Sequence, residues 1–148
     1  MNRHLIRHGV FLALLGTLSG FAPMLVTNPR MGLAAHVGGL MNALLLLALG
    51  AVWSEVSMGA KRELVTTRLL LAGAYGNWAI TLSAAMTGAE EFAPLAGAGY
   101  GAGPTVEKVT LILITVAGAC TLAGLVMTAL QFRERRRPSN NGMHQTGR

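Results

Sequence analysis

The sequence contains no aspartate, and only 12% of its 148 residues are charged, whereas 52% are hydrophobic and the mean hydropathy is +0.49. A typical soluble domain carries a charged fraction of about 25%, so this balance excludes an ordinary water-soluble protein. We therefore predict a small membrane protein that consists of one helical domain without a separate soluble module.

Cysteine is nearly absent as well. The single thiol, Cys120, excludes an intrachain disulfide and a cysteine-based zinc site. The sequence also lacks a dinucleotide-binding glycine fingerprint and the cysteines of an iron–sulfur cluster, so it carries no built-in electron supply. Every glutamate lies outside the long apolar stretches, which argues against a proton-coupled transporter of the small four-helix type, because such a protein needs a membrane carboxylate or an equivalent titratable group.

Four stretches without charged side chains are each long enough to span a bilayer, which takes about 20 helical residues. They comprise residues 9–29, 31–54, 69–89 and 109–132. We predict an all-α membrane protein in which residues 1–132 form a four-transmembrane-helix bundle and residues 133–148 form a basic, disordered tail. The first stretch has features of a secretory signal, but Pro23 directly follows its only small-residue cleavage site, so we expect a retained helix.

Basic residues gather at one end of the predicted bundle. Two arginines precede the first stretch, three basic residues lie in the connection after the second, and five arginines follow the fourth. The other two connections hold only Arg30 and Lys108. The positive-inside tendency then places the N- and C-termini in the cytoplasm, and we expect a multi-pass protein of the bacterial inner membrane. The net charge of +6 reflects this topology and contact with the lipid bilayer, so no nucleic acid partner is needed.

Few polar side chains lie within the predicted spans, and each is costly in a bilayer unless it is paired or functional. They are His36, Asn42, Tyr75, Asn77 and Thr81. His36 and Asn42 fall within one sector of roughly 120° on the second helix, so we expect them to open toward one side. Tyr75 points about 200° away from Asn77, so either Gly76 distorts the third helix or the two residues face different neighbours.

His36 is the only embedded side chain able to ligate a metal strongly. The alternative is a histidine that bonds a neighbouring helix, with Asn42 joining two helices. His4, His8 and His144 lie near the chain ends, where we expect no role in activity. The connection at residues 90–108 is glycine-rich and fits a flexible lid, a partly re-entrant loop or an ordinary solvated connection.

Three segments carry a family resemblance: MNRHLIRHGVFLALLGTLSGF, then NPRMGLAAHVGGLMNALLLLALGAVW, and AYGNWAITLSAAM. They resemble the hydroxylaminobenzene mutase family, small four-span membrane proteins similar to styrene oxide isomerase. The most specific element is NPRMGL, with a histidine six residues after its arginine. The resemblance covers residue 1 to about residue 132.

The resemblance implies an isomerase with ferric heme b held between neighbouring subunits of a homotrimer, with His36 as the axial ligand of the metal. It also implies catalytic roles for Asn42 and for a tyrosine of the third span, for which Tyr75 is the candidate. Asn77 is a further catalytic candidate for steadying the migrating hydroxyl. Arg30 either pairs with a heme propionate at the membrane edge or is simply interfacial.

We therefore expect a small aromatic substrate, hydroxylaminobenzene, to be rearranged to 2-aminophenol by intramolecular hydroxyl transfer. Substrate and product are isomers, so the reaction needs no electron donor, and the ferric heme would act as a Lewis acid. The alternatives are an epoxide-to-aldehyde isomerase like styrene oxide isomerase, a heme-bearing electron-transfer membrane anchor with two axial ligands, and a structural or transport bundle without a cofactor.

Overall fold

The computed structural model describes residues 1–132. Its elements are α1 (Arg3–Leu18), η1 (Ser19–Met24), α2 (Pro29–Val52), η2 (Trp53–Glu55), α3 (Ala60–Thr87), α4 (Pro94–Gly97) and α5 (Pro104–Ala129). Within residues 1–132 there is no β-strand, only an isolated bridge between Val56 and Phe132. Four helices, with α1 extended by η1 and α2 by η2, are long and apolar enough to cross a membrane. The predicted all-α fold with four such helices is confirmed, whereas the predicted tail at 133–148 lies outside the described residues.

The third and fourth long helices start earlier than the apolar stretches do. α3 begins at Ala60 instead of residue 69, and α5 begins at Pro104 instead of residue 109. Lys61 and Arg62 are exposed in the first turn of α3. A charged side chain ends an apolar pattern but does not interrupt the backbone hydrogen bonds of a helix, so these two helices extend beyond the predicted apolar spans.

α1 ends early, at Leu18, and continues as the 3-10 helix η1, which contains Pro23. Proline lacks an N–H, and its ring clashes with the carbonyl of the residue four positions earlier, here Ser19, so an α-helix does not run through it undistorted. The last four carbonyl groups of an α-helix have no intrahelical partner, and that of Gly16 is among them. This end of α1 therefore offers backbone acceptors to other side chains.

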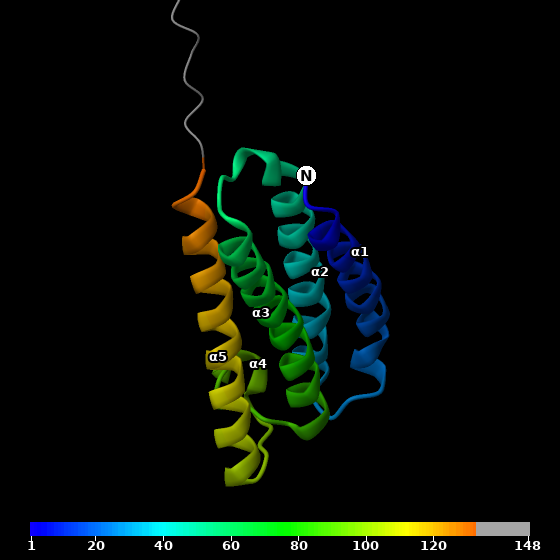
Figure 1. The fold of residues 1–148 in the computed structure, drawn as a ribbon. Helices are drawn as coiled ribbons and strands as arrows, with labels where there is room; N and C mark the ends of the chain where they lie inside the picture. Colours follow the sequence, from blue (N-terminus) through cyan, green and yellow to red (C-terminus); the bar gives the residue numbers. More distant parts are fainter. Residues whose placement is uncertain (133–148) are drawn as a thin grey trace, which may run out of the picture.

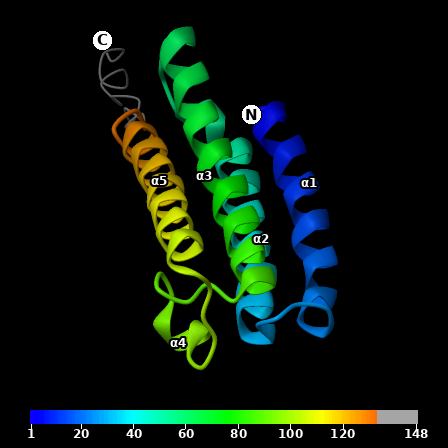
Figure 2. The ribbon, with the colours of Figure 1, turned by 90° about the horizontal axis from the view of Figure 1, so that it is seen from below.

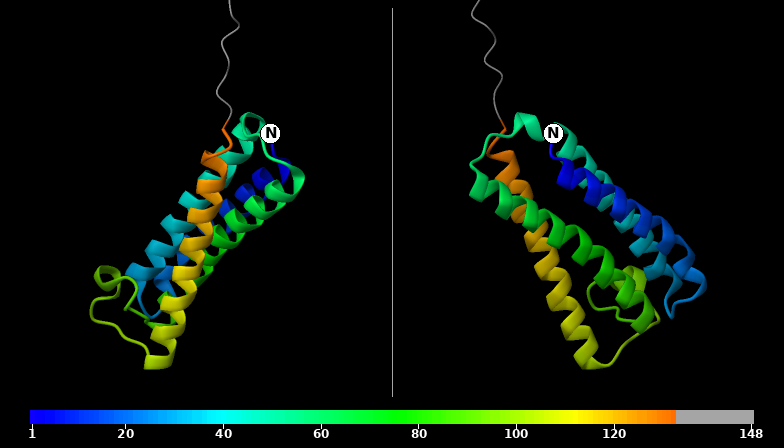
Figure 3. Two further views of the ribbon diagram at one scale, coloured as in Figure 1. Left: turned by 60° about the vertical axis from the view of Figure 1, so that its left-hand side comes forward. Right: turned by 45° about the vertical axis from the view of Figure 1, so that its right-hand side comes forward.

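The four long helices stand side by side in a row in which α1 packs on α2, α2 on α3, and α3 on α5 (Figure 1). The view from below places α1 and α5 at the two ends of this row (Figure 2). At one end of the helices, the N–H of Asn2 donates to Gly50 O over 2.8 Å, and that of Ser57 donates to Gln131 O over 2.9 Å. The N-terminus, the α2–α3 connection and the end of α5 therefore share one end, and α4 lies at the other (Figure 3).

Glycines allow close contact between neighbouring helices. A Cβ atom at Gly39 would lie 3.0 Å from Gly16 Cα, and one at Gly73 would lie 2.8 Å from the backbone nitrogen of Thr121. Small residues permit such approach in a bilayer, where lipid supplies no hydrophobic drive between helices. The α1–α2 and α3–α5 interfaces therefore depend on glycine at these positions.

Residues 88–103 form a folded segment, here called the cap. The buried carboxylate of Glu107 accepts hydrogen bonds of 2.9 to 3.2 Å from the backbone N–H groups of Glu90, Glu91 and Ala102. Asn28 Nδ2 donates to Ala96 O over 2.9 Å and so ties the cap to the start of α2. The glycine-rich connection is thus held by hydrogen bonds to the start of α2 and to α5, while its role as a lid, a re-entrant loop or a solvated connection stays a prediction.

Candidate functional site

His36 lies on α2 and faces the end of α1. Its Nδ1 is 2.7 Å from the carbonyl oxygen of Gly16, and the ring is half-buried. The ring fits against Gly20, where an added Cβ would come within 3.0 Å of Nδ1. A carbonyl oxygen only accepts, so Nδ1 carries a proton, and the neutral form of the ring has its lone pair on Nε2. This is the tautomer that a histidine uses when Nε2 ligates a metal and Nδ1–H is anchored by the protein.

The histidine therefore bonds a neighbouring helix, as one interpretation of the sequence predicted, and this bond is compatible with a role as a metal ligand, which stays a prediction. One ring nitrogen bonds a neighbouring helix, and the other is available as a ligand. Residues 1–132 contain no group of three or more His, Cys, Asp and Glu side chains that could hold a metal ion. A single imidazole is the axial donor that heme takes in many proteins, so His36 fits that group.

Asn42 and Asn77 meet between α2 and α3. The Nδ2 of Asn42 donates to Oδ1 of Asn77 over 3.0 Å, and both side chains are half-buried. They line a groove of about 410 Å³ together with Gly38, Met41, Gly118, Thr121, Leu122 and Leu125. The groove is an apolar trough with one amide pair in its wall, which suits an arene that carries a small polar group.

The expectation that His36 and Asn42 open toward one side is wrong for a single chain. His36 bonds α1, whereas Asn42 bonds α3. Between them runs the buried strip of α2, which includes Ala35, Gly39 and Ala43 and packs against both neighbouring helices. The two side chains therefore lie at opposite edges of this strip, and the groove at Asn42 does not include His36.

Tyr75 faces away from Asn77, as one of the two alternatives predicted. Its hydroxyl donates to the carbonyl oxygen of His8 over 3.2 Å and lies 3.1 Å from His8 Nδ1. Since α3 runs without a break from Ala60 to Thr87, no distortion at Gly76 brings the two residues together. In one chain Tyr75 thus joins α3 to α1 and does not reach the groove at Asn42.

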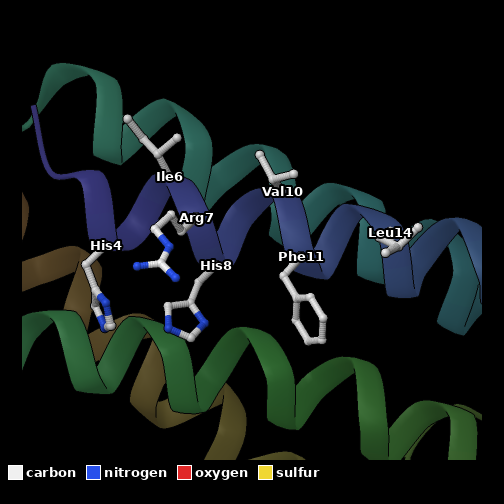
Figure 4. Close-up of a pocket in the computed structure, with 7 residues that line it drawn as sticks. All are labelled: His4, Ile6, Arg7, His8, Val10, Phe11 and Leu14. Atoms are coloured by element: carbon white, nitrogen blue, oxygen red, sulfur yellow. The ribbon is translucent and has the colours of Figure 1, made fainter.

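The His8 side of α1 borders a second groove of about 630 Å³ (Figure 4). His4, His8 and Phe11 extend from α1 toward α3 there, and the rings of His4 and His8 meet edge to face with centroids 4.5 Å apart. His8 therefore has a structural partner in Tyr75, which its position near the chain end did not indicate.

Arg30 lies at the start of α2 and is held by the cap. Its guanidinium donates to Ala98 O and sits 5.6 Å from the ring centroid of Tyr100. A guanidinium has five N–H donors, so these contacts leave others for an anionic group. Arg30 is exposed and remains a candidate for binding a propionate.

Two further side chains near His36 were not found from the sequence. Trp78 packs over Gly39, where an added Cβ would lie 2.6 Å from Trp78 Cδ1, and Trp78 Nε1 donates to Ser19 Oγ over 3.3 Å. The only signal in the sequence was an intramembrane tryptophan next to Asn77, and nothing there pointed to Ser19.

The comparisons with known proteins agree with the resemblance. A family model described as styrene oxide isomerase matches residues 1–133. Hydroxylaminobenzene mutase HabB of Ectopseudomonas oleovorans is 38% identical over 101 residues, which are 68% of this chain and 62% of HabB. The match thus spans less than two thirds of HabB. Hydroxylaminobenzene mutase HabA of the same organism is 33% identical over 129 residues, 86% of this chain and 96% of HabA. No solved structure matches significantly.

Proposed function

The chain belongs to the styrene oxide isomerase family, and we propose that it is a membrane isomerase that rearranges hydroxylaminobenzene to 2-aminophenol. The observation that carries this choice of substrate is the likeness to two hydroxylaminobenzene mutases, one of which the chain matches over 96% of its length. The hydroxyl group moves within the substrate, so the reaction consumes no oxygen, reductant or nucleotide.

Ferric heme b is the proposed cofactor, with Nε2 of His36 as its axial ligand. The hydrogen bond from Nδ1 to Gly16 supports this assignment, because it leaves Nε2 free and fixes the ring. Ferric heme, when bound, supplies a Lewis acid that weakens the N–O bond of the substrate. Arg30 would hold a propionate through the N–H groups that the cap leaves available.

A neighbouring copy of the chain completes the proposed site. His36 and Asn42 lie at different edges of α2 and contact different helices, so a site that uses both needs a second subunit. A homotrimer with heme between adjacent subunits meets this requirement, because in a closed ring one edge of each subunit meets the other edge of the next.

The amide pair orients the substrate in this proposal. With its NH₂ group engaged by Asn77, Asn42 presents Oδ1 as an acceptor for the N–H or O–H of the hydroxylamine. The apolar wall formed by Met41, Leu122 and Leu125 holds the arene and excludes water, so the hydroxyl returns to the ring. Tyr75 would take part in catalysis only from a neighbouring subunit.

The proposed location is the bacterial inner membrane. The N-terminus, the α2–α3 connection and the end of α5 lie at one end of the helices. Five of the seven basic residues in residues 1–132 lie close to that end, in the N-terminal parts of α1 (Arg3 and Arg7) and of α3 (Lys61, Arg62 and Arg68). We place that end in the cytoplasm by the positive-inside tendency.

The second candidate function is isomerisation of an epoxide to an aldehyde. The match to the styrene oxide isomerase family favours it, and the same ligand and apolar groove would serve. An epoxide has no hydrogen-bond donor, so it would gain less from the acceptor of Asn42 than a hydroxylamine does.

Anaerobic membranes that contain the protein test the proposal when they receive hydroxylaminobenzene without added nucleotide. We expect 2-aminophenol, with no oxygen from labelled water, and a Soret band in the purified protein. Incorporation of solvent oxygen would refute intramolecular transfer, and a colourless, fully active preparation would refute the heme. Turnover of styrene oxide alone would refute the substrate but keep the isomerase class.

A further inference from the structure

The carbonyl oxygen that holds His36 also belongs to a chain of hydrogen bonds from a third helix. Ser19 Oγ donates to Gly16 O over 2.7 Å, the same oxygen that lies 2.7 Å from His36 Nδ1. Trp78 Nε1 in turn donates to Ser19 Oγ over 3.3 Å. Side chains from η1, α2 and α3 thus converge directly or indirectly on one backbone acceptor at the end of α1.

The central bond of this chain, from Ser19 to Gly16, is buried, and the bonds of His36 and Trp78 on either side of it are partly buried. Ser19 is only 6% exposed, and Trp78 reaches it by packing over Gly39, the glycine of α2 that also contacts Gly16. Hydrogen bonds shielded from water are stronger and more directional than exposed ones. The position of the Gly16 oxygen is therefore fixed from two sides, by its own helix end and by the indole of α3.

On the basis of the proposed function, in which His36 ligates heme, we propose that Ser19 and Trp78 are positioning residues for His36. The hydroxyl of Ser19 fixes the Gly16 oxygen, and Trp78 fixes that hydroxyl. The oxygen then holds His36 in the Nδ1–H tautomer and aims Nε2 outward as the ligand. A partner on the second ring nitrogen orients a ligating imidazole and raises its basicity, so disturbing the support is expected to weaken metal binding.

Ser19→Ala and Trp78→Phe test this role in the full chain. Ser19→Ala removes both bonds of the hydroxyl, whereas Trp78→Phe removes the N–H donor and keeps an aromatic ring over Gly39. The matched control is Ser83→Ala, because Ser83 Oγ makes a local bond of 2.8 Å to Ala79 O and the residue is exposed. A structural role alone would lower stability without changing the tautomer of His36.

The first readout is nitrogen-15 NMR of histidine-labelled, heme-free full-length protein in lipid nanodiscs. We expect His36 to be a single Nδ1–H tautomer in the wild type and in Ser83→Ala, and a mixture of tautomers in Ser19→Ala, with a smaller change in Trp78→Phe. A single Nδ1–H tautomer in all variants would overturn the proposal.

The second readout is heme affinity on reconstitution. We expect Ser19→Ala to lose on the order of tenfold, the lower end of the range for partners of metal ligands, because the Gly16 oxygen itself remains. Tighter binding in Ser19→Ala would mean that the hydroxyl competes with His36 for the oxygen, and would overturn the positioning role. If the wild type bound no heme, the proposed function would fall, while the NMR result would still decide the role of Ser19 and Trp78.

Discussion

Gly39→Ala is the substitution that most directly tests the close packing around His36. A Cβ atom at this position would lie 2.6 Å from Trp78 Cδ1, 3.0 Å from Gly16 Cα and 3.3 Å from Trp78 Nε1. Ordinary van der Waals contact begins at 3.4 Å, so the indole must retreat by about 0.8 Å. The indole is also hydrogen-bonded to Ser19, so this movement strains or breaks that bond.

The expected cost follows from two opposing effects. Forcing a methyl group into a well-packed interface costs about 1–3 kcal/mol, whereas replacing a helical glycine by alanine recovers about 1 kcal/mol. The net expectation is a loss of up to about 2 kcal/mol, together with weaker heme retention, because α1 and α2 separate next to His36. Unfolding in a mixed-micelle denaturant series would measure the first effect, and the Soret absorbance per protein would measure the second.

Gly118→Ala is the matched control, since a Cβ there would meet no atom within 4 Å. It should leave stability unchanged or raise it slightly through helix propensity. If Gly39→Ala were as stable as Gly118→Ala and kept its full heme content, the argument from close packing would be refuted.

Three further outcomes are expected. His36→Ala should lose heme and turnover but keep its helix content, measured by circular dichroism, whereas His4→Ala should keep heme and turnover. Heme retention in His36→Ala would disprove the ligand assignment. Tyr75→Phe should lower the free energy of unfolding by about 0.6 kcal/mol, the average value of an interhelical hydrogen bond in a membrane. It should keep most turnover, because the Tyr75 hydroxyl bonds His8. A large loss of rate at unchanged stability would instead make Tyr75 catalytic. Glu107→Gln should lower the free energy of local opening of the cap by about 1.5–3 kcal/mol, since it replaces a charged acceptor of backbone N–H groups. Equal rates of amide hydrogen exchange in the cap of the wild type and of Glu107→Gln would contradict this.

The number and type of the helices could be predicted because a helix that spans a bilayer needs a long apolar stretch, and such stretches can be identified directly in the sequence. Helix ends were less predictable. The exposed Lys61 and Arg62 interrupt the apolar pattern but continue the helix. The angle between Tyr75 and Asn77 followed from helical geometry alone, and the structure confirms that they face different helices.

The neighbours of each helix face could not be predicted in the same way. Helical geometry predicts that His36 and Asn42 lie roughly 120° apart around α2, but the sequence does not say that α1 covers one edge of α2 and α3 the other. Ser19 has no sequence signal at all, because its role depends on where α1 ends and on a tryptophan 59 residues further along the chain.

The oxygen that anchors His36 belongs to a peptide group, and this has a consequence for how the protein tolerates change. No substitution at position 16 can remove the backbone carbonyl, so the acceptor is present whatever the side chain there. Its position in space, however, can change. That location depends on the path of the chain, which leaves the α-helix before Pro23. Gly32 accommodates this path, because a Cβ atom there would lie only 3.3 Å from the Pro23 nitrogen. Mutational sensitivity should therefore concentrate at residues that steer the backbone, and a scan that records only lost side-chain contacts would overlook them.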